Sequence, residues 1–149
     1  MKIIATNRKA SFNYFIEEKF EAGIILTGSE VKSLRAGKVS IDESYVGDIK
    51  GELYLLNAFI SKYTQSNRFN HDETRPRKLL LHTNQINKLL GNLKKNGKTI
   101  IALQLYFNKN NKVKIEISLA SGKKLFDKRA VIKERDWKRE KSRLLTTSK

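Results

Sequence analysis

The segment from Lys112 to Ala120 alternates between polar and apolar residues, and this pattern constrains the fold more than any other feature of the chain. Successive side chains of a β-strand point to opposite faces, so the alternation predicts a strand with one buried face. The segment Thr99–Phe107 is also strand-like, and residues 108–111 between the two have the composition of a turn. We therefore expect an antiparallel hairpin. The residues expected on the buried face of its first strand are Ile101, Leu103, Leu105 and Phe107.

Other segments carry weaker strand signals. Residues 44–49 and 52–60 predict a second hairpin, with its turn at Lys50-Gly51. Tyr14–Gly28 predicts one long strand that bends at Ala22-Gly23, where glycine tolerates a bulge. A shorter strand is expected at residues 78–82. Many short antiparallel strands favour a closed barrel, because closure removes exposed sheet edges.

Two helices are expected among these strands. After Thr83, apolar residues recur at helical spacing from Ile86 to Leu93. Thr27 and Glu30 have the spacing of a capping box, and Gly37 ends the short apolar stripe that follows them. The expected fold is thus mainly β with flanking α-helices, in an OB-like closed antiparallel barrel.

The net charge of the chain indicates a polyanionic partner. Its 149 residues include 31 Lys and Arg against 15 Asp and Glu, which gives a formal net charge of +16. A field of this sign attracts nucleic acids first and anionic membrane surfaces second, and its self-repulsion favours a monomer. There is no cysteine for a disulfide or a thiolate site. We see no signal peptide and no apolar stretch near the ~20 residues of a membrane span, so a cytoplasmic location is expected.

Catalytic signals in the sequence are weak. Asn70-His71-Asp72-Glu73 holds one of only two histidines, and it is the only stretch that suggests a metal or a general base. Adjacent side chains seldom converge on one point, so we expect His71 to be a loop residue that forms hydrogen bonds or contacts RNA. A ribonuclease that uses His71 and Asp72 stays open as an alternative. The sequence otherwise predicts no enzyme, no cofactor and no metal.

Clusters of cations mark the expected RNA-binding surface. Lys32 and Arg35 lie three residues apart on the exposed face of the short helix, opposite Val31 and Leu34. Aromatic side chains between the clusters can stack on unpaired bases. Cations coat any helix of a basic protein, so the patch as a whole supports RNA binding better than any single residue does. Its members are Asn7, Arg8, Lys9, Tyr14, Lys32, Arg35, Lys38, Arg75, Arg77 and Lys78.

The C-terminal residues form a second unit. Residues 122–143 contain ten Lys or Arg and four Asp or Glu, a local net charge of +6. Ala130, Trp137 and Leu144 recur every seven residues, a stripe too narrow to bury a helix against a core. Pairs such as Glu134 and Lys138 add only a few tenths of a kcal/mol to helix stability. We therefore expect a barrel over residues 1–121 and a basic tail over 122–149 that is disordered when free and helical against RNA.

Three long blocks of the chain resemble the bacterial SsrA-binding protein (SmpB, tmRNA-binding protein) family. The blocks are NRKASFNYFIEEKFEAGIILTGSEVKSLRAGK, SNRFNHDETRPRKLLLH and GKKLFDKRAVIKERDWKRE. The resemblance implies an OB-like barrel that binds the tRNA-like domain of tmRNA. It further implies delivery of tmRNA to ribosomes stalled without a stop codon, with peptide tagging and ribosome rescue. Elongation factor Tu and alanyl-tRNA synthetase would be indirect partners through tmRNA, and the protein would catalyse no covalent chemistry.

The resemblance also implies residue roles. On the barrel it adds Glu21, Leu80 and Lys112 to the tmRNA contacts, and it includes Ser33 within the GSEVKSLR block. The tail would occupy the ribosomal decoding centre and the empty mRNA channel. The implied tail contacts are Gly122, Lys123, Lys124, Phe126, Asp127, Lys128, Arg129, Ile132, Lys133, Glu134, Arg135 and Trp137. Departures are Lys62, where many relatives have proline, and Phe126, where tyrosine or histidine is common. A generic OB-type RNA-binding or ribosomal protein is the non-enzymatic alternative.

Overall fold

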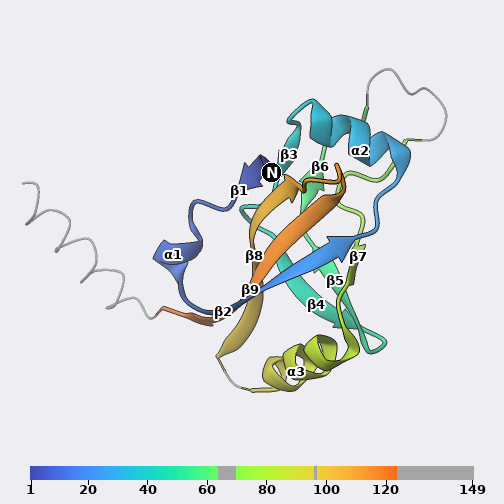
Figure 1. Ribbon diagram of the computed structural model, residues 1–149. Coiled ribbons are helices and arrows are strands. Elements are labelled where there is room, and N and C mark those ends of the chain that lie inside the picture. Colours follow the sequence, from blue (N-terminus) through green and yellow to red (C-terminus); the bar gives the residue numbers. More distant parts are fainter. Residues whose placement is uncertain (64–69, 96, 124–149) are drawn as a thin grey trace, which may run out of the picture.

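The computed structural model describes residues 1–63, 70–95 and 97–123. The strands within these ranges are β1 (Lys2–Thr6), β2 (Tyr14–Ile24), β3 (Val39–Ser40), β4 (Tyr45–Ile49), β5 (Glu52–Leu56), β6 (Phe59–Ile60), β7 (Arg77–Leu80), β8 (Lys98–Phe107) and β9 (Val113–Gly122). The helices are α1 (Ala10–Asn13), α2 (Gly28–Arg35) and α3 (Thr83–Leu93) (Figure 1).

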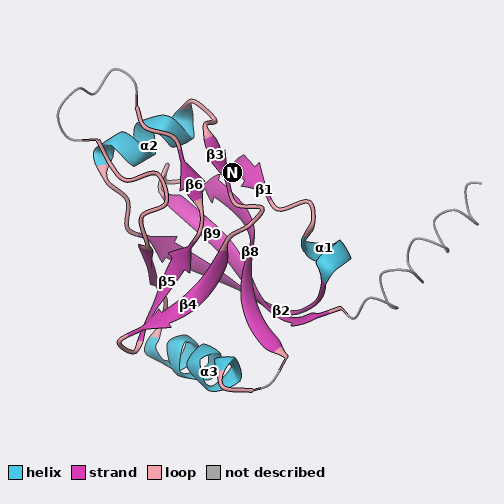
Figure 2. Cartoon of the chain, turned by 180° about the vertical axis from the view of Figure 1, so that it is seen from behind, coloured by secondary structure: helices cyan, strands magenta, loops and turns pink. Residues whose placement is uncertain are grey.

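Six of the described strands close into the barrel that the sequence predicts. The sheet order is β1-β8-β4-β5-β7-β2-β9, and a further pairing of β8 with β9 completes the ring. All of these pairings are antiparallel, and β1 lies outside the ring on the edge of β8. The helices α2 and α3 lie at opposite ends of the barrel (Figures 1 and 2). The short β3–β6 pair lies at the α2 end.

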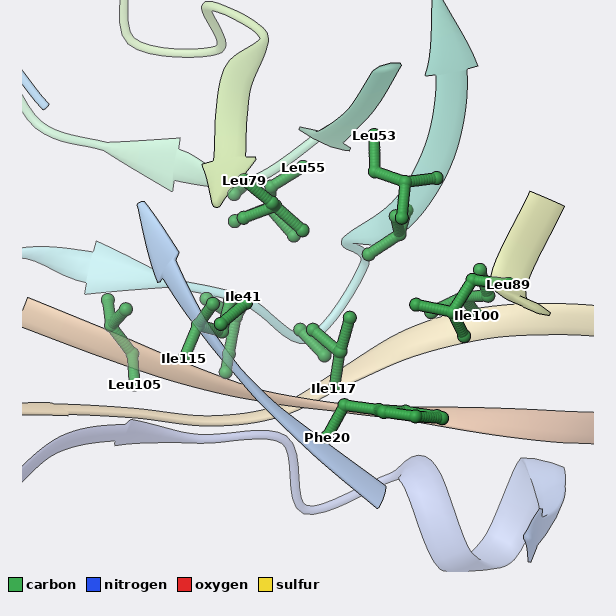
Figure 3. Packing of buried hydrophobic residues seen from close by; sticks show 14 of the residues in the cluster. Phe20, Ile41, Leu53, Leu55, Leu79, Leu89, Ile100, Leu105, Ile115 and Ile117 are labelled. Atoms are coloured by element: carbon green, nitrogen blue, oxygen red, sulfur yellow. The ribbon is translucent and has the colours of Figure 1, made fainter. Parts of the chain in front are cut away.

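The barrel interior is filled by apolar side chains from every strand of the ring (Figure 3). On β9 the inward residues Ile115, Ile117 and Leu119 follow the predicted alternation. At one end, α3 places Leu89 in the core with no exposed surface, and its other apolar residues pack beside it. Each of these side chains contributes about 1.5–3 kcal/mol by leaving water.

The predicted buried face of β8 is wrong in its first half. Ile100 and Ala102 enter the barrel core together with Leu105, whereas Ile101 and Leu103 pack in a second cluster outside it. The cause is a register shift between Ala102 and Gln104, seen in the pairing with β9. An extra residue in one strand exchanges the two faces beyond it, so alternation fails across a bulge.

The predicted bend of β2 is also misplaced. The register shift of β2 against β9 lies between Ile16 and Lys19, not at Ala22-Gly23. Gly23 has a different role, because β2 and β7 approach closely at this point. A Cβ atom at Gly23 would lie 3.2 Å from the Cβ of Leu80, closer than ordinary van der Waals contact. The strand ends at Ile24, four residues before the predicted end at Gly28.

The turns and caps follow the sequence closely. The β4–β5 hairpin turns at Lys50 and Gly51, with φ of 54° and 81°, as a two-residue hairpin turn requires. The second predicted strand of this hairpin is interrupted at Asn57, whose φ is 60°, so β6 is a separate strand that pairs with β3. The capping box of α2 is present in both directions between Thr27 and Glu30.

The barrel extends slightly beyond the predicted boundary at residue 121. Gly122 pairs with Tyr14 as the last residue of β9, and the Lys123 amide donates to the Asn13 carbonyl at 2.9 Å. The remaining tail residues, 124–149, lie outside the described residues. Among the residues that are described, no helix is long and apolar enough to cross a membrane.

Candidate nucleic-acid interface

The outer face of the adjacent strands β7, β2 and β9 carries a hollow surface that we term the Leu80 groove. Ala22 of β2 points into the core, so its neighbours Glu21 and Gly23 point outward. In the same way Leu79 of β7 is buried, while Leu80 is 52% exposed. Strand alternation therefore places an acidic, a small and a large apolar residue side by side on this face.

Leu80 forms a ridge between the two hollows of the groove. One hollow, of about 340 Å³, extends toward Glu21. The other, of about 430 Å³, extends toward Lys112. Gly23, Leu80 and Lys114 line both hollows, so the surface is continuous. The structure thus brings together the three barrel residues that the resemblance implied from distant parts of the chain.

The carboxylate of Glu21 is fixed by a tyrosine that sequence reasoning missed. The Tyr106 hydroxyl donates a hydrogen bond to Glu21 Oε2 across β9. Tyr106 is only 4% exposed. Burial raises the pKa of its hydroxyl, and the hydrogen bond to Glu21 and the nearby charge of Glu116 raise it further. The hydroxyl therefore keeps its proton at neutral pH and holds one carboxylate oxygen, which leaves the other oxygen for a ligand.

One of the predicted cations of α2, Arg35, lies beside the second hollow. Val31 of α2 lines that hollow, and Lys32, Arg35 and Lys38 are exposed. The Arg35 guanidinium lies 5.9 Å from the centre of the Phe107 ring, which also lines the hollow. Such cation–π contacts hold a long side chain in place without neutralising it. The arrangement suits a phosphate backbone that follows bases lying in the groove.

Two of the predicted RNA contacts, Arg77 and Ser33, are buried in the structure. Their assignment to the RNA-binding surface is therefore wrong. Arg77 has no exposed surface, because its Nε donates to Glu30 Oε2 at 2.6 Å. It also donates to the Ala58 carbonyl at 2.7 Å. Ser33 is 1% exposed, and its hydroxyl donates to the Ser61 carbonyl at 2.6 Å. Both side chains fasten α2 to neighbouring segments of the barrel.

The two cations that flank Arg77, Arg75 and Lys78, have partly exposed side chains. Arg75 keeps 34% of its side-chain surface exposed while its Nη2 pairs with Glu30 Oε1 at 2.6 Å. Lys78 is 3.1 Å from Glu52 Oε1, with both side chains partly exposed. Of the basic run that the sequence offers, only these two can therefore reach a phosphate, and each must share its charge with a carboxylate.

Glu30 is the acidic partner that organises this basic run. Burial acts to raise the pKa of its carboxyl, but hydrogen bonds from Arg75, the Thr27 amide and Arg77 outweigh burial and lower the pKa. The carboxylate is thus charged at neutral pH with no exposed surface. The capping-box spacing predicted its contact with Thr27 but gave no sign of the two arginines.

The N-terminal set of predicted contacts lies beside α1. Arg8 and Lys9 are exposed, whereas Asn7 is 8% exposed and donates from Nδ2 to the Ala102 carbonyl at 3.0 Å. Tyr14 is half-buried against the second apolar cluster. None of these four residues lines either hollow of the Leu80 groove.

Comparison with known proteins shows which family the chain belongs to. A sequence model described as "SmpB protein" matches residues 4–147. The SsrA-binding protein of Rickettsia typhi is 61% identical over 97% of this chain and 95% of the relative. The chain belongs to the SmpB family. The SsrA-binding protein of Rickettsia canadensis is 60% identical over the same shares of both chains.

A solved structure of the SmpB family has the same fold. It is described as "tmRNA-SmpB: a journey to the center of the bacterial ribosome" and superposes with a TM-score of 0.67 and 46% sequence identity. The match covers 80% of this chain and 84% of that chain.

His71, the candidate base of a ribonuclease, is a structural residue in this SmpB family member. It is 6% exposed, and its Nε2 lies 2.9 Å from the Ile60 carbonyl. A carbonyl can only accept, so Nε2 carries the proton and Nδ1 accepts from the Ser29 hydroxyl at 2.9 Å. Both ring nitrogens are therefore engaged inside the protein, which matches the first of the two roles expected for His71, that of a loop residue that forms hydrogen bonds. Within the described ranges, no group of three His, Asp or Glu side chains could hold a metal.

The predicted tail contacts fall almost entirely outside the described residues. Gly122 and Lys123 are described, and both belong structurally to the barrel. The Lys123 ammonium donates to the Ser11 carbonyl at 2.8 Å and lies 5.0 Å from the centre of the Phe15 ring. The tail predictions outside the described residues are Lys124, Phe126, Asp127, Lys128, Arg129, Ile132, Lys133, Glu134, Arg135 and Trp137.

Proposed function

We propose that this chain binds the tRNA-like domain of tmRNA and delivers it to ribosomes stalled without a stop codon. Trans-translation, peptide tagging and release of the ribosome then follow. The observation that carries this proposal is the Leu80 groove. It combines an exposed apolar ridge, a carboxylate fixed by Tyr106, and the cations Lys112 and Lys114 in one hollow surface. Membership of the SmpB family supports the choice of tmRNA among RNAs.

The groove has the chemistry that unpaired RNA requires. Bases that leave a helix need an apolar surface to cover them and hydrogen-bond partners for their edges. Leu80 and the walls of the second hollow supply the apolar surface, and the free oxygen of Glu21 accepts from a base edge. Lys112 and the α2 cations then contact the flanking phosphates, which should dominate the affinity.

The division of labour that we propose assigns tmRNA to the barrel and the ribosome to the tail. The tail beyond Lys123 would contact the decoding centre and the empty mRNA channel, and its cations favour that partner. Elongation factor Tu and alanyl-tRNA synthetase would then act on the same RNA, and this chain would carry no binding groove for either of them. We propose no covalent chemistry for the protein, a cytoplasmic location and a monomeric state.

A competition assay separates this proposal from a generic RNA-binding or ribosomal protein. Labelled tRNA-like domain is bound to the full chain and displaced with unlabelled tmRNA, bulk tRNA or an unrelated RNA of equal length. The proposal predicts that tmRNA displaces the label at concentrations at least about tenfold lower than the other two. Equal displacement by all three RNAs would favour the generic alternative.

A truncation after Lys123 tests the division of labour. The cut spares every described core residue and the contacts of Lys123 with α1. The truncated chain should bind the tRNA-like domain within about threefold of the full chain. It should fail to support peptide tagging on stalled ribosomes. Loss of RNA binding together with tagging would place part of the RNA contact in the tail.

A further inference from the structure

A cavity of about 410 Å³ lies beside α1 on the outer face of β2, β9 and β8, and the described function does not use it. Two register shifts occur at this place. β2 shifts between Ile16 and Lys19, and β8 shifts between Ala102 and Gln104. Both shifts face residues 116–120 of β9, the strand between them. Bulges re-aim side chains and are common beside functional sites. The cavity is therefore a built feature of the barrel wall, which we term the α1 pocket.

The lining of the α1 pocket joins an apolar base to a polar rim. Ile16 and Leu103 belong to the second apolar cluster and are only half-buried, so they present apolar surface to the pocket. Lys19, Gln104 and Glu116 supply an ammonium, an amide and a carboxylate at the rim. A flat ring with a hydrogen-bonding edge fits this combination, and the cavity volume lies in the usual range for small ligands.

Asn7, which lines this pocket and also a second cavity of about 160 Å³, holds a buried acceptor without a hydrogen-bond partner. Asn7 is 8% exposed, and its orientation is fixed because only the Nδ2 amide group can donate to the Ala102 carbonyl. Its Oδ1 is consequently the other atom, and it is buried without a hydrogen-bond partner. A buried acceptor without a donor is costly, so a ligand or a bridging water that supplies an N–H or O–H is favoured here.

The α1 pocket adjoins the Leu80 groove. Glu116 of the pocket pairs in register with Glu21 of the groove, and both side chains face outward from neighbouring strands. Arg8 and Lys9 are exposed in the segment that leads into α1. An RNA strand that occupies the groove can therefore continue into the pocket with cations near its phosphates.

We propose that the α1 pocket takes one unpaired guanine of the RNA held by the groove, an inference that rests on the proposed function. Guanine is the base whose Watson–Crick edge presents two adjacent donors, N1–H and the N2 amino group. A carboxylate such as that of Glu116 accepts both at once, while the Lys19 ammonium donates to O6. The other bases present at most one donor group beside an acceptor on that edge. The Glu116 carboxylate together with the Lys19 ammonium therefore selects guanine.

Methyl NMR of the full chain tests the proposal with mononucleotides. GMP should shift the Leu103 and Ile16 methyl signals in a saturable way, with the Leu89 methyls of the core as an unmoved reference. IMP, which lacks the N2 amino group, should bind about tenfold more weakly, and so should AMP. Glu116→Gln should remove the preference of GMP over IMP, whereas the control Glu52→Gln on β5 should retain it. Equal binding of GMP, IMP and AMP, or no shift at Leu103, would overturn the proposal.

The same signals separate failure of this inference from failure of the proposed function. When the tRNA-like domain of tmRNA is titrated into the full chain, Leu80 reports the groove and Leu103 reports the α1 pocket. Shifts at both support the inference. A shift at Leu80 with none at Leu103 overturns the guanine pocket and leaves the groove intact. No shift at either residue overturns the proposed function and the inference together.

Discussion

Glu30 of α2 and Arg77 of β7 form an ion pair with neither side chain exposed, at 2.6 Å between Oε2 and Nε. The pair joins the helix that carries the exposed cations Lys32 and Arg35 to the barrel wall. Because a charge left alone in the interior is costly, the two residues depend on each other. The same pair sets the position of one side of the RNA interface.

Replacing Glu30 by glutamine should destabilise the fold strongly. Glu30→Gln leaves Arg77 buried without its carboxylate, which costs about 3–5 kcal/mol of unfolding free energy. The matched control is Glu52→Gln, which removes the exposed pair with Lys78 and should cost less than about 1 kcal/mol. Urea unfolding of both variants checks the difference. Similar small losses in both would contradict a structural role for the buried pair.

The pH dependence of stability should carry the signature of Glu30. Its folded-state pKa lies below the ordinary 4.5, because hydrogen bonds from Arg75, Thr27 and Arg77 outweigh burial. The stabilisation is therefore complete above pH 4.5 and is lost as the pH falls through the folded-state pKa. Wild-type unfolding free energy should fall more steeply below pH 4.5 than that of Glu30→Gln. Parallel curves for the two proteins would show that Glu30 does not contribute.

Tyr106 should affect RNA binding only through Glu21. Tyr106→Phe removes the hydroxyl that holds the carboxylate and keeps the ring, so affinity for the tRNA-like domain should fall about three- to tenfold. In a Glu21→Ala background the same change should have no effect. Tyr54→Phe is the control, because the Tyr54 hydroxyl contacts Glu52 at 3.5 Å in an exposed position. An equal loss in both backgrounds would mean that Tyr106 acts on the fold instead.

The floor of the Leu80 groove should tolerate no extra carbon atom. In Gly23→Ala the new Cβ would lie 3.2 Å from the Cβ of Leu80, so Leu80 must shift by a few tenths of an ångström, while the Lys114 ammonium at 3.7 Å would be in ordinary contact. RNA affinity should fall severalfold while the barrel remains folded. Gly91→Ala in α3 meets nothing within 4 Å. It should leave binding unchanged and raise unfolding free energy by about 0.5–1 kcal/mol. Unchanged RNA affinity in Gly23→Ala would argue against the groove.

Much of the fold could be predicted because it depends on local pattern. Alternation in residues 112–120 specified β9 and its buried face, and the spacing of Thr27 and Glu30 specified the start of α2. The bulges at Ala102 and Ile16 could not be predicted, because a register shift depends on how two distant strands pair. When a strand contains a bulge, the inward and outward faces are exchanged on one side of it, so alternation assigns the residues there to the wrong face.

The candidate site was predictable only in part. Arg75 and Arg77 are equivalent in the sequence, and both pair with Glu30, which lies more than forty residues away in the chain. Only Arg77 is fully buried, because it lies in β7 on the same face as the buried Leu79. Alternation places Tyr106 on the outer face, but its hydrogen bond to Glu21 could not be predicted because it depends on how β8 and β2 both pair with β9. Lys114 could have been found, since it stands on the polar face of the alternating strand. Alternation with a period of two residues identifies the two faces of a strand, but tertiary contacts decide which polar side chains remain free to bind a ligand.

A charge reversal at either end of the barrel tests the central claim most directly. Lys112→Glu at the groove and Lys95→Glu near α3 change the net charge equally, and both residues are exposed. The dissociation constant of the tRNA-like domain is measured for both variants and the wild type at several salt concentrations. We predict that Lys112→Glu weakens binding at least about tenfold and reduces the salt slope by about one. Lys95→Glu should stay within about threefold of the wild type. Equal losses in the two variants would contradict a tmRNA site at the Leu80 groove.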